Sequence, residues 1–210
     1  MTALGWQSIG FSGIRENQFI GHDDGTLEVI SEESISSLNF PVGALTGTTR
    51  CLSWSWRVDV AMPPNDLRHR DTDDRPIAIF VTYPFDPDRA TFWEHVKRIF
   101  VELAHGPDAP GRIVSYVWGG LGARGDMQPS PYLQSAGGIV LLRPGAQETG
   151  VWRNESVDLA ADYIRAFGAP APRPTQVAVL ADSDSTHSRA HAFVRSLRFT
   201  DSCVEVVPAT

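Results

Sequence analysis

Acidic residues that follow an apolar stretch are the best candidates for chemistry in this chain, in the sequence DSDST at positions 182–186. An Asp-x-Asp-x-Thr pattern after a strand is typical of phosphotransfer loops, which also need a lysine further along, and no lysine follows Thr186. Asp182, Asp184 and Thr186 also match the first three ligand positions of an EF-hand loop. Such a loop needs glycine at its sixth position and glutamate at its twelfth, where this chain has histidine and phenylalanine. We therefore assign no metal ligand, and expect the two carboxylates to stabilise a turn, with a ligand or metal contact as the alternative.

Two aromatic residues near glycine-rich turns are candidates for ligand binding. Trp118 ends an apolar stretch directly before two glycines, and Tyr132 lies in the segment that follows. A sugar ring has an apolar face and a polar rim, so a site that binds it combines an exposed aromatic ring with hydrogen-bonding side chains. Trp118 fits a packed core equally well, because tryptophan is highly buried on average. The predicted ligand-binding residues are Trp118, Tyr132, Arg57, Asp182 and Asp184.

Other groups of polar residues give no catalytic signature. Several acids could supply the carboxylate pair of a glycoside hydrolase, but their spacing singles out no two of them. Asp158 and Asp162 are four residues apart on a predicted helix, where a solvated face or an ion pair with Arg165 is the simpler interpretation. His187 and His191 lead into a strand without further zinc ligands. We predict no catalytic residue and no cofactor.

A strictly alternating segment at residues 52–60 is expected to organise the fold. Large apolar residues, among them Trp54 and Trp56, alternate with serines and with Arg57 and Asp59. A period of two with apolar residues on one side predicts a β-strand that has one face on the core. We predict that both indole rings are buried and that Arg57 and Asp59 lie on the opposite face.

The remaining segments predict many short strands and two helices. The nearly continuous apolar run at residues 76–85 is typical of a central strand that is covered on both faces. Helical periodicity predicts amphipathic helices at residues 91–104 and 157–167, the second of which ends at Gly168. The polar, proline-broken segment at residues 62–75 is predicted to be an exposed loop.

The order of these elements favours an all-β fold with minor α content. Short strands without a βαβ rhythm predict a jelly-roll-like β-sandwich of two mostly antiparallel sheets plus two peripheral helices. Residues 1–210 suit one domain of this kind and are predicted to form a single β-sandwich domain. The glycine-containing segment at residues 121–134 is expected to form a long loop over one edge or mouth of the sandwich.

Composition and charge exclude some classes of partner. The net charge is −7 and no run of basic residues occurs, so we expect no nucleic-acid partner. No apolar segment is long enough for a membrane span or a signal peptide. We expect a cytoplasmic protein if Met1 is native, and a periplasmic or secreted one if a signal peptide was trimmed. Cys51 and Cys203 have no metal-ligand spacing, and separate reduced thiols are favoured over a disulfide, which stays open.

Four segments occur in a specific order along the chain: LSWSWRVD at residues 52–59, the Asp73-Asp74 step before an apolar strand, YVW at residues 116–118, and the strand that ends in DSDST. This order resembles a bacterial family, the domain of unknown function numbered three thousand and forty-seven, over roughly residues 25–200. The resemblance implies a β-sandwich of the galactose-binding-like jelly-roll class and no established activity. The chain has Ala78 and Ser196 where the family tends to have an arginine and an aspartate. The second difference argues against the structural calcium of that class.

These observations favour a non-catalytic binding module, whose first expected ligand is a carbohydrate or another polyhydroxylated compound. One alternative is a structural or assembly protein that docks on a partner protein through one sheet face, which a contiguous exposed apolar patch would support. A third hypothesis is a carbohydrate-active enzyme that uses an acid pair, which two carboxylates in one cleft would support.

Overall fold

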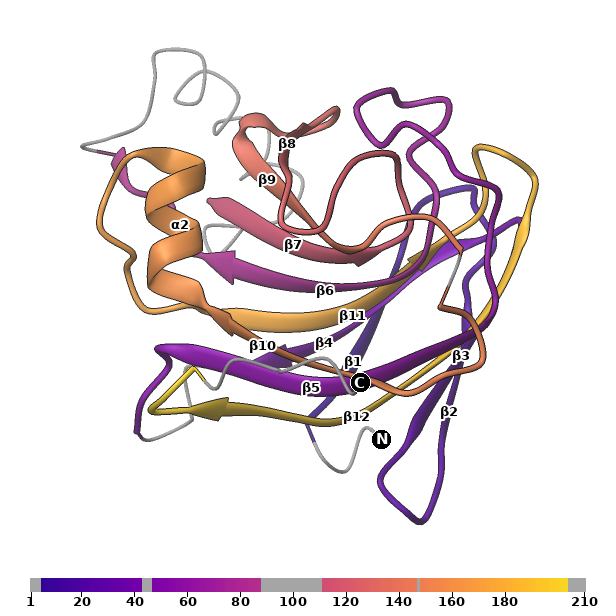
Figure 1. Ribbon diagram of the computed structural model, residues 1–210, viewed down its shortest axis with the longest axis horizontal. Helices are drawn as coiled ribbons and strands as arrows, with labels where there is room; N and C mark the ends of the chain where they lie inside the picture. Colours follow the sequence, from indigo (N-terminus) through magenta and orange to yellow (C-terminus); the bar gives the residue numbers. More distant parts are fainter. Residues whose placement is uncertain (1–4, 43–46, 88–110, 147, 204–210) are drawn as a thin grey trace.

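The computed structural model describes residues 5–42, 47–87, 111–146 and 148–203, and shows two β-sheets packed face to face (Figure 1). Among these residues, the larger sheet has seven strands, in the order β1 (Gln7–Gly10), β4 (Ile35–Pro41), β11 (Gln176–Asp182), β6 (Arg75–Tyr83), β7 (Arg112–Trp118), β9 (Gln134–Arg143) and β8 (Met127–Ser130). The smaller sheet has five, in the order β10 (Arg153–Asp158), β5 (Cys51–Val60), β12 (Arg189–Thr200), β3 (Leu27–Glu32) and β2 (Gln18–Gly21). Neighbouring strands are antiparallel except β7 and β9, which are parallel. The predicted β-sandwich is confirmed.

Aromatic side chains from both sheets form the centre of the core. In β5 every second residue points toward the other sheet, and Trp54 and Trp56 are buried, as predicted. Their rings contact Tyr116 and Trp118 of β7, with centroids 5.8 Å and 5.6 Å apart. Because aromatic pairs at such distances add to the free energy of burial, these contacts hold the two sheets against each other.

Strand β6 is covered on both faces, as its continuous apolar sequence predicts. Ile77 points into the core, whereas Ala78 points to the outer face of the seven-stranded sheet, where Leu67 packs on it. Leu67 belongs to the segment at residues 62–75, and it is fully buried, as is Asp74 at the end of that segment. The prediction of an exposed loop is therefore wrong there. The segment covers a sheet face and so must bury some of its own side chains.

One helix, α2 (Leu159–Phe167), occurs among the described residues and packs beside the sandwich (Figure 1). The Asp158 side chain accepts hydrogen bonds from two backbone N–H groups of its first turn. Gly168, in the left-handed conformation with φ of 65°, ends the helix, as predicted. The expected start at Val157 is two residues early, because β10 continues to Asp158. The count of two helices is not matched, and the predicted helix at residues 91–104 lies outside the described residues.

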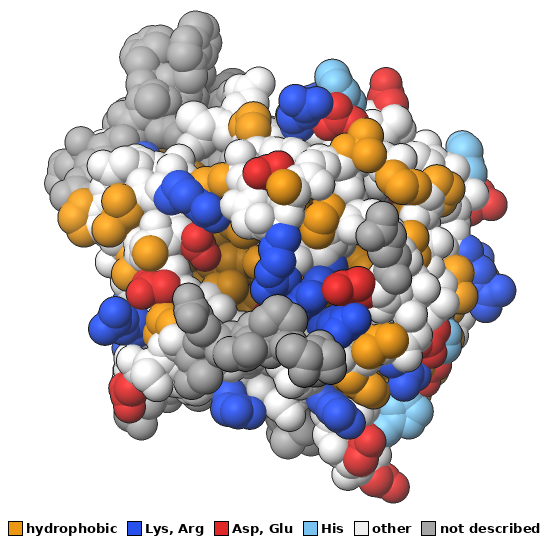
Figure 2. Space-filling view, in the orientation of Figure 1, with side chains coloured by type: hydrophobic (Ala, Val, Ile, Leu, Met, Phe, Trp, Pro, Cys, Tyr) orange, Lys and Arg blue, Asp and Glu red, His pale blue; other side chains and the backbone are white. Residues whose placement is uncertain are grey.

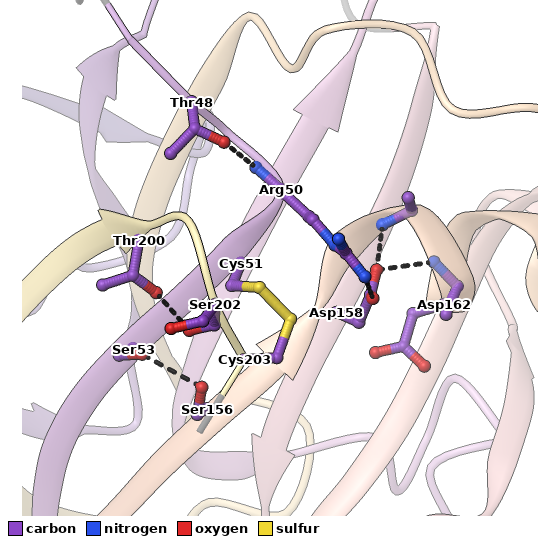
Figure 3. Close-up of a disulfide and its surroundings, with 12 residues drawn as sticks. Thr48, Arg50, Cys51, Ser53, Ser156, Asp158, Asp162, Thr200, Ser202 and Cys203 are labelled. Atoms are coloured by element: carbon purple, nitrogen blue, oxygen red, sulfur yellow. Dashed lines mark hydrogen bonds and ion pairs between the residues drawn. A yellow bond between two sulfur atoms is a disulfide. The ribbon is translucent and has the colours of Figure 1, made fainter. Parts of the chain in front are cut away.

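A disulfide joins Cys51, at the start of β5, to Cys203, which follows β12 (Figure 3). The prediction that favoured reduced thiols is wrong. The reason lies in the pairing of distant strands, since Cys51 is opposite Thr200 in the ladder between β5 and β12. The chain turns shortly after Thr200, which brings the two cysteine Cα atoms to 5.2 Å. Figure 3 also shows Ser53 bonded to Ser156 on the neighbouring strand β10.

Charged side chains of both signs are mixed on the surface. Figure 2 shows basic and acidic side chains next to one another on one face, with hydrophobic side chains between them. In the described part of the chain, no helix has the length and apolar character needed to cross a membrane.

Candidate functional site

A cavity of about 350 Å³ lies on the outer face of the seven-stranded sheet. Its floor consists of side chains that point away from the core on neighbouring strands, because residues alternate between the two faces of a sheet. The lining is mainly apolar, and its charged residues, Arg75, Asp182 and Asp184, lie close together at one end, a composition typical of small-molecule pockets. The apolar lining includes Phe80, Ile113, Ile139 and Leu180 from the sheet, and Ile14 and Leu133 from flanking segments.

Two segments outside the floor build the walls of the cavity. Tyr132 and Leu133, between β8 and β9, form the first wall. They belong to residues 121–134, which the sequence predicts to be a long loop over one edge or mouth of the sandwich, and this segment also contains strand β8. The chain between β1 and β2 contributes Phe11. Gly137 allows the close approach of the first wall, since a Cβ atom there would lie 2.7 Å from the Leu133 side chain. The cavity thus depends on segments that lie far apart in the sequence.

A buried ion cluster forms the polar end of the cavity. Arg75 donates hydrogen bonds from Nη2 to Oδ2 of Asp73 and to Oδ2 of Asp182, each 2.9 Å long. Arg75 is the first residue of β6 and Asp182 is the last residue of β11, and the two are partners in the ladder between these strands. Their side chains are 7% and 3% exposed. Strand pairing therefore fixes this ion pair in place.

Asp74 holds the DSDST turn in position beside the cluster. Its carboxylate accepts hydrogen bonds from the backbone N–H groups of Ser185 and Thr186, and from the Thr186 hydroxyl. The turn-stabilising role that the sequence suggested for Asp182 or Asp184 thus belongs to Asp74. Asp182 and Asp184 both line the cavity.

A network of buried polar side chains anchors the end of β11 from the other side. The Ser183 hydroxyl lies 2.7 Å from the Ser31 hydroxyl and accepts a hydrogen bond from the backbone N–H of Ser34. The Asn17 amide donates to a backbone carbonyl of β11. Satisfied buried networks favour a single geometry. We infer that this one sets the position of the neighbouring Asp182.

Burial changes the acid–base behaviour of the cluster. It raises the pKa of Asp182 to about 8; Arg75 opposes this rise, and the nearby carboxyl groups of Asp184 and Asp73 add to it. Burial also raises the pKa of Asp73, against the influence of Arg75. The cluster therefore binds a proton more tightly than a solvated aspartate does.

The acids of the cluster are close enough together to be considered as metal ligands. Asp73, Asp74 and Asp182 offer carboxylate oxygens within 4.8 Å of one another. Two of these carboxylates already bind Arg75, and the third binds the DSDST turn. A metal ion would have to displace the guanidinium group. We therefore treat these residues as an ion cluster and not as a metal centre.

Three of the predicted binding residues line this one cavity, namely Tyr132, Asp182 and Asp184. The Tyr132 side chain is on the rim, and the residue is 51% exposed. The Arg70 guanidinium lies 5.1 Å from the centre of its ring, a cation–π contact that holds the ring in place. The structure brings these residues together, and their role in ligand binding stays a prediction.

The other two predicted residues lie elsewhere. Trp118 is 0% exposed and packs on Trp56 in the core, so it cannot present its ring to a ligand at the surface. The alternation of β7 turns it inward. Arg57 lies on the outer face of the five-stranded sheet, where it pairs with Asp59 at 2.8 Å and stacks on Phe193. Neither residue belongs to the cavity.

Sequence reasoning did not identify Arg75 or the apolar floor. The available signal is the position of Arg75 directly before the apolar run at residues 76–85. From there a long side chain can reach the end of the neighbouring strand. Phe80 and Leu180 lie in strands that are apolar on both faces. Periodicity does not show which face of such a strand meets the core.

A family model described as a protein of unknown function, DUF3047, matches residues 4–198. The chain belongs to this family. The match confirms the resemblance seen in the sequence, and it spans every strand of the seven-stranded sheet and the whole lining of the cavity. A comparison with curated proteins gave no match. Membership in the DUF3047 family assigns no activity, so the function has to be argued from the cavity.

Proposed function

We propose that the protein is a non-catalytic binding module that holds a small organic ligand in the cavity on the outer face of the seven-stranded sheet. The cavity itself carries the proposal, because apolar side chains form its floor and walls and its charged groups lie at one end. Covering apolar surface gains about 25 cal/mol per Å². The charged end would orient the ligand by hydrogen bonds.

The way the cavity is built also supports binding. Its floor belongs to paired strands, and its polar end is fixed by the Arg75–Asp182 ion pair and by the turn that Asp74 holds. A site that is already ordered costs less conformational entropy when the ligand binds. A rigid, partly apolar cavity of this size suits a ligand with an apolar body and at least one polar group.

A matched pair of tryptophan variants tests the proposal. Ile113 is half-buried in the cavity and Ile20 is half-exposed on β2 of the other sheet. N-phenylnaphthylamine, an apolar fluorescent probe, should bind the wild-type protein and Ile20→Trp, and should lose most of its binding to Ile113→Trp, whose indole fills the cavity. Equal binding to all three proteins, or no binding to the wild type, would contradict the proposal.

A carbohydrate is the second candidate for the ligand. Its specific support is Tyr132, whose half-exposed ring stands beside Asp182 and Asp184 in the same cavity. A sugar could stack on the ring and donate hydroxyl hydrogen bonds to the carboxylates. A glycan array should then show binding by the wild-type protein that Tyr132→Ala removes. Trp118 lies in the core and should make no contact with the sugar. No signal on the array would remove this candidate.

Two other hypotheses stay predictions. The position of Asp182 and Asp184 in one cavity supports the hypothesis of a carbohydrate-active enzyme that uses an acid pair. Release of product from chromogenic glycosides would test this hypothesis. Docking on a partner protein is tested by pull-down with the intact chain. The jelly-roll topology and the galactose-binding-like class also stay proposals.

The disulfide bears on the compartment. Disulfides persist mainly in oxidising compartments, and Cys51–Cys203 supports a periplasmic or secreted protein more than a cytoplasmic one. Thiol labelling of the protein in its own cells, before any exposure to air, should find both cysteines unreactive. Two reactive thiols would support the cytoplasm.

A further inference from the structure

We propose that the cavity selects a protonated amine attached to an apolar body, with the amine held by Asp182 and Asp184. This inference rests on the proposed binding function and names the ligand class for the same site. It depends on the charge balance at the polar end of the cavity, on a buried acceptor atom without a partner, and on the apolar lining.

The charge balance favours a cation. Four aspartates, at positions 73, 74, 182 and 184, share this end of the cavity with the guanidinium of Arg75. A proton on Asp182 reduces the excess of negative charge but does not remove it. Arg70 adds one positive charge beside the Tyr132 ring, where its guanidinium also donates to the carbonyl oxygen of Pro131, and the four carboxyl groups still outnumber the two guanidinium groups. A carboxylate or phosphate ligand would meet repulsion here, whereas an ammonium group would be attracted.

The hydrogen-bonding state of Asp182 favours an N–H donor. In the ionised form its Oδ2 atom accepts from Arg75, and its buried Oδ1 atom has no donor among the described residues; in the protonated form the neighbouring Asp184 carboxylate can accept the hydrogen bond of that proton. Asp182 is 2% exposed and lines the cavity. Buried carboxylate oxygens are normally hydrogen-bonded. A donor on the ligand would complete the set, and Asp184, half-buried on the same wall, offers a second acceptor.

The apolar lining excludes a purely polar cation. Phe80, Ile113, Ile139 and Leu180 form the part of the floor that continues from the acids. A metal ion or a bare ammonium ion would leave these side chains in contact with water and would gain nothing from them. A hydrocarbon or aromatic body next to the amine would cover them while the charge reaches the acids.

The same geometry predicts that binding depends on pH. Asp182 faces Arg75 from β6, Asp73 and Asp74 from the preceding loop, Asp184 from the DSDST turn, and Tyr132 from the wall. Because the pKa of Asp182 is raised to about 8, an amine has to displace its proton. Affinity should therefore rise by about tenfold per pH unit up to about pH 8 and then level off, until the amine itself loses its proton near pH 10.

Three probes of similar shape test the inference by titration calorimetry on the full chain: phenethylammonium, phenethyl alcohol and hydrocinnamate. We expect phenethylammonium to bind about tenfold more tightly than the alcohol, and hydrocinnamate to bind more weakly than either. Asp184→Asn should weaken the ammonium by about tenfold and leave the alcohol unchanged. Asp23→Asn, at an exposed acid in the turn between β2 and β3, should change neither.

The outcomes separate this inference from the proposed function. If the alcohol binds as tightly as the ammonium, or if Asp184→Asn has no effect on the ammonium, the preference for an amine is overturned while the cavity remains a binding site. If neither these probes nor N-phenylnaphthylamine binds the wild-type protein, the binding function itself fails and the inference fails with it.

Discussion

The Nη2 atom of Arg75 lies 2.9 Å from Oδ2 of Asp182, at the point where β6 begins and β11 ends. The same nitrogen donates to Asp73, so one buried guanidinium group holds two buried carboxyl groups. This relationship joins the fold to the cavity, since it closes the polar end of the site and depends on the register of two neighbouring strands.

Replacing Arg75 by methionine should destabilise the protein strongly. The variant would remove the donor that holds the buried carboxyl groups of Asp73 and Asp182, and breaking a buried pair by removing one partner typically costs about 3–5 kcal/mol of the free energy of unfolding. Denaturant unfolding at neutral pH measures this cost. Arg68→Met is the matched control, because Arg68 pairs with Asp66 at 2.7 Å but is 58% exposed; its unfolding midpoint should hardly move. Similar losses of unfolding free energy in both variants would show that the buried ion pairs stabilise the fold no more than an exposed pair does.

Stability should fall as the pH rises from about 4 to about 8. The folded state holds a proton on Asp182 up to a pKa of about 8, whereas the unfolded chain loses that proton near its ordinary value of 3.8. The folded state therefore binds more protons in this window, and the free energy of unfolding decreases with pH. The raised pKa values of Asp73 and Asp162 act in the same direction.

Asp182→Asn isolates that effect. The amide can still accept a hydrogen bond from Arg75 but cannot titrate, so the thermal midpoint of the variant should decline less between about pH 5 and about pH 8 than that of the wild type. A variant with the same slope as the wild type would show that Asp182 is ionised across the whole range.

Removing the disulfide should destabilise the fold without altering the cavity. Cys51 and Cys203 are 152 residues apart in the sequence, and closing so long a loop stabilises a folded protein by about 2–5 kcal/mol. The double variant Cys51→Ser/Cys203→Ser should lose that amount of unfolding free energy in urea. A reducing agent should lower the unfolding free energy of the wild-type protein and leave that of the variant unchanged. If the reducing agent leaves the wild type unchanged, the bond does not contribute.

Trp118→Ala should affect stability and not ligand recognition. The side chain is fully buried against Trp56, and truncating a buried tryptophan costs about 3–5 kcal/mol. Tyr132→Ala, at a half-exposed rim position, should change unfolding little and weaken probe binding instead. The reverse pattern would return Trp118 to the ligand site and remove Tyr132 from it.

Asp74→Ala should loosen the turn that carries Asp184. The backbone N–H groups of Ser185 and Thr186 would lose their acceptor, and leaving such groups unsatisfied costs about 1–3 kcal/mol. Amide hydrogen exchange should increase at these two residues and stay unchanged at Ser183, which the serine network holds. Equal exchange rates at Ser185 and Thr186 in the variant and in the wild type would contradict this role of Asp74.

Local sequence patterns predict much of the fold. The alternation in β5 is visible because one face meets the core and the other carries serines, and both indole rings lie where this pattern predicts. The disulfide is not predictable in this way. It depends on which strand lies next to β5, and the residue opposite Cys51 is Thr200, far along the chain. Pairing of this kind is set by tertiary packing and leaves no local signal.

The site is predictable only in part, for the same reason. Asp182, Asp184 and Tyr132 stand out because polar or aromatic residues beside turns are unusual enough to notice, and they do share one cavity. Trp118 was ambiguous because a strand end alone does not say which way its last side chain points. Arg75 contributes through a neighbour 107 positions away, a separation that spacing rules do not cover.

The position of the bound ligand tests the central claim most directly. Two-dimensional amide NMR spectra of the isotopically labelled wild-type protein, recorded during a titration with phenethylammonium, report which residues the probe contacts. We predict shifts at Ile113, Leu180, Asp184 and their neighbours around the cavity on the seven-stranded sheet. Shifts confined to the other sheet, around Arg57 and Phe193, would contradict the account.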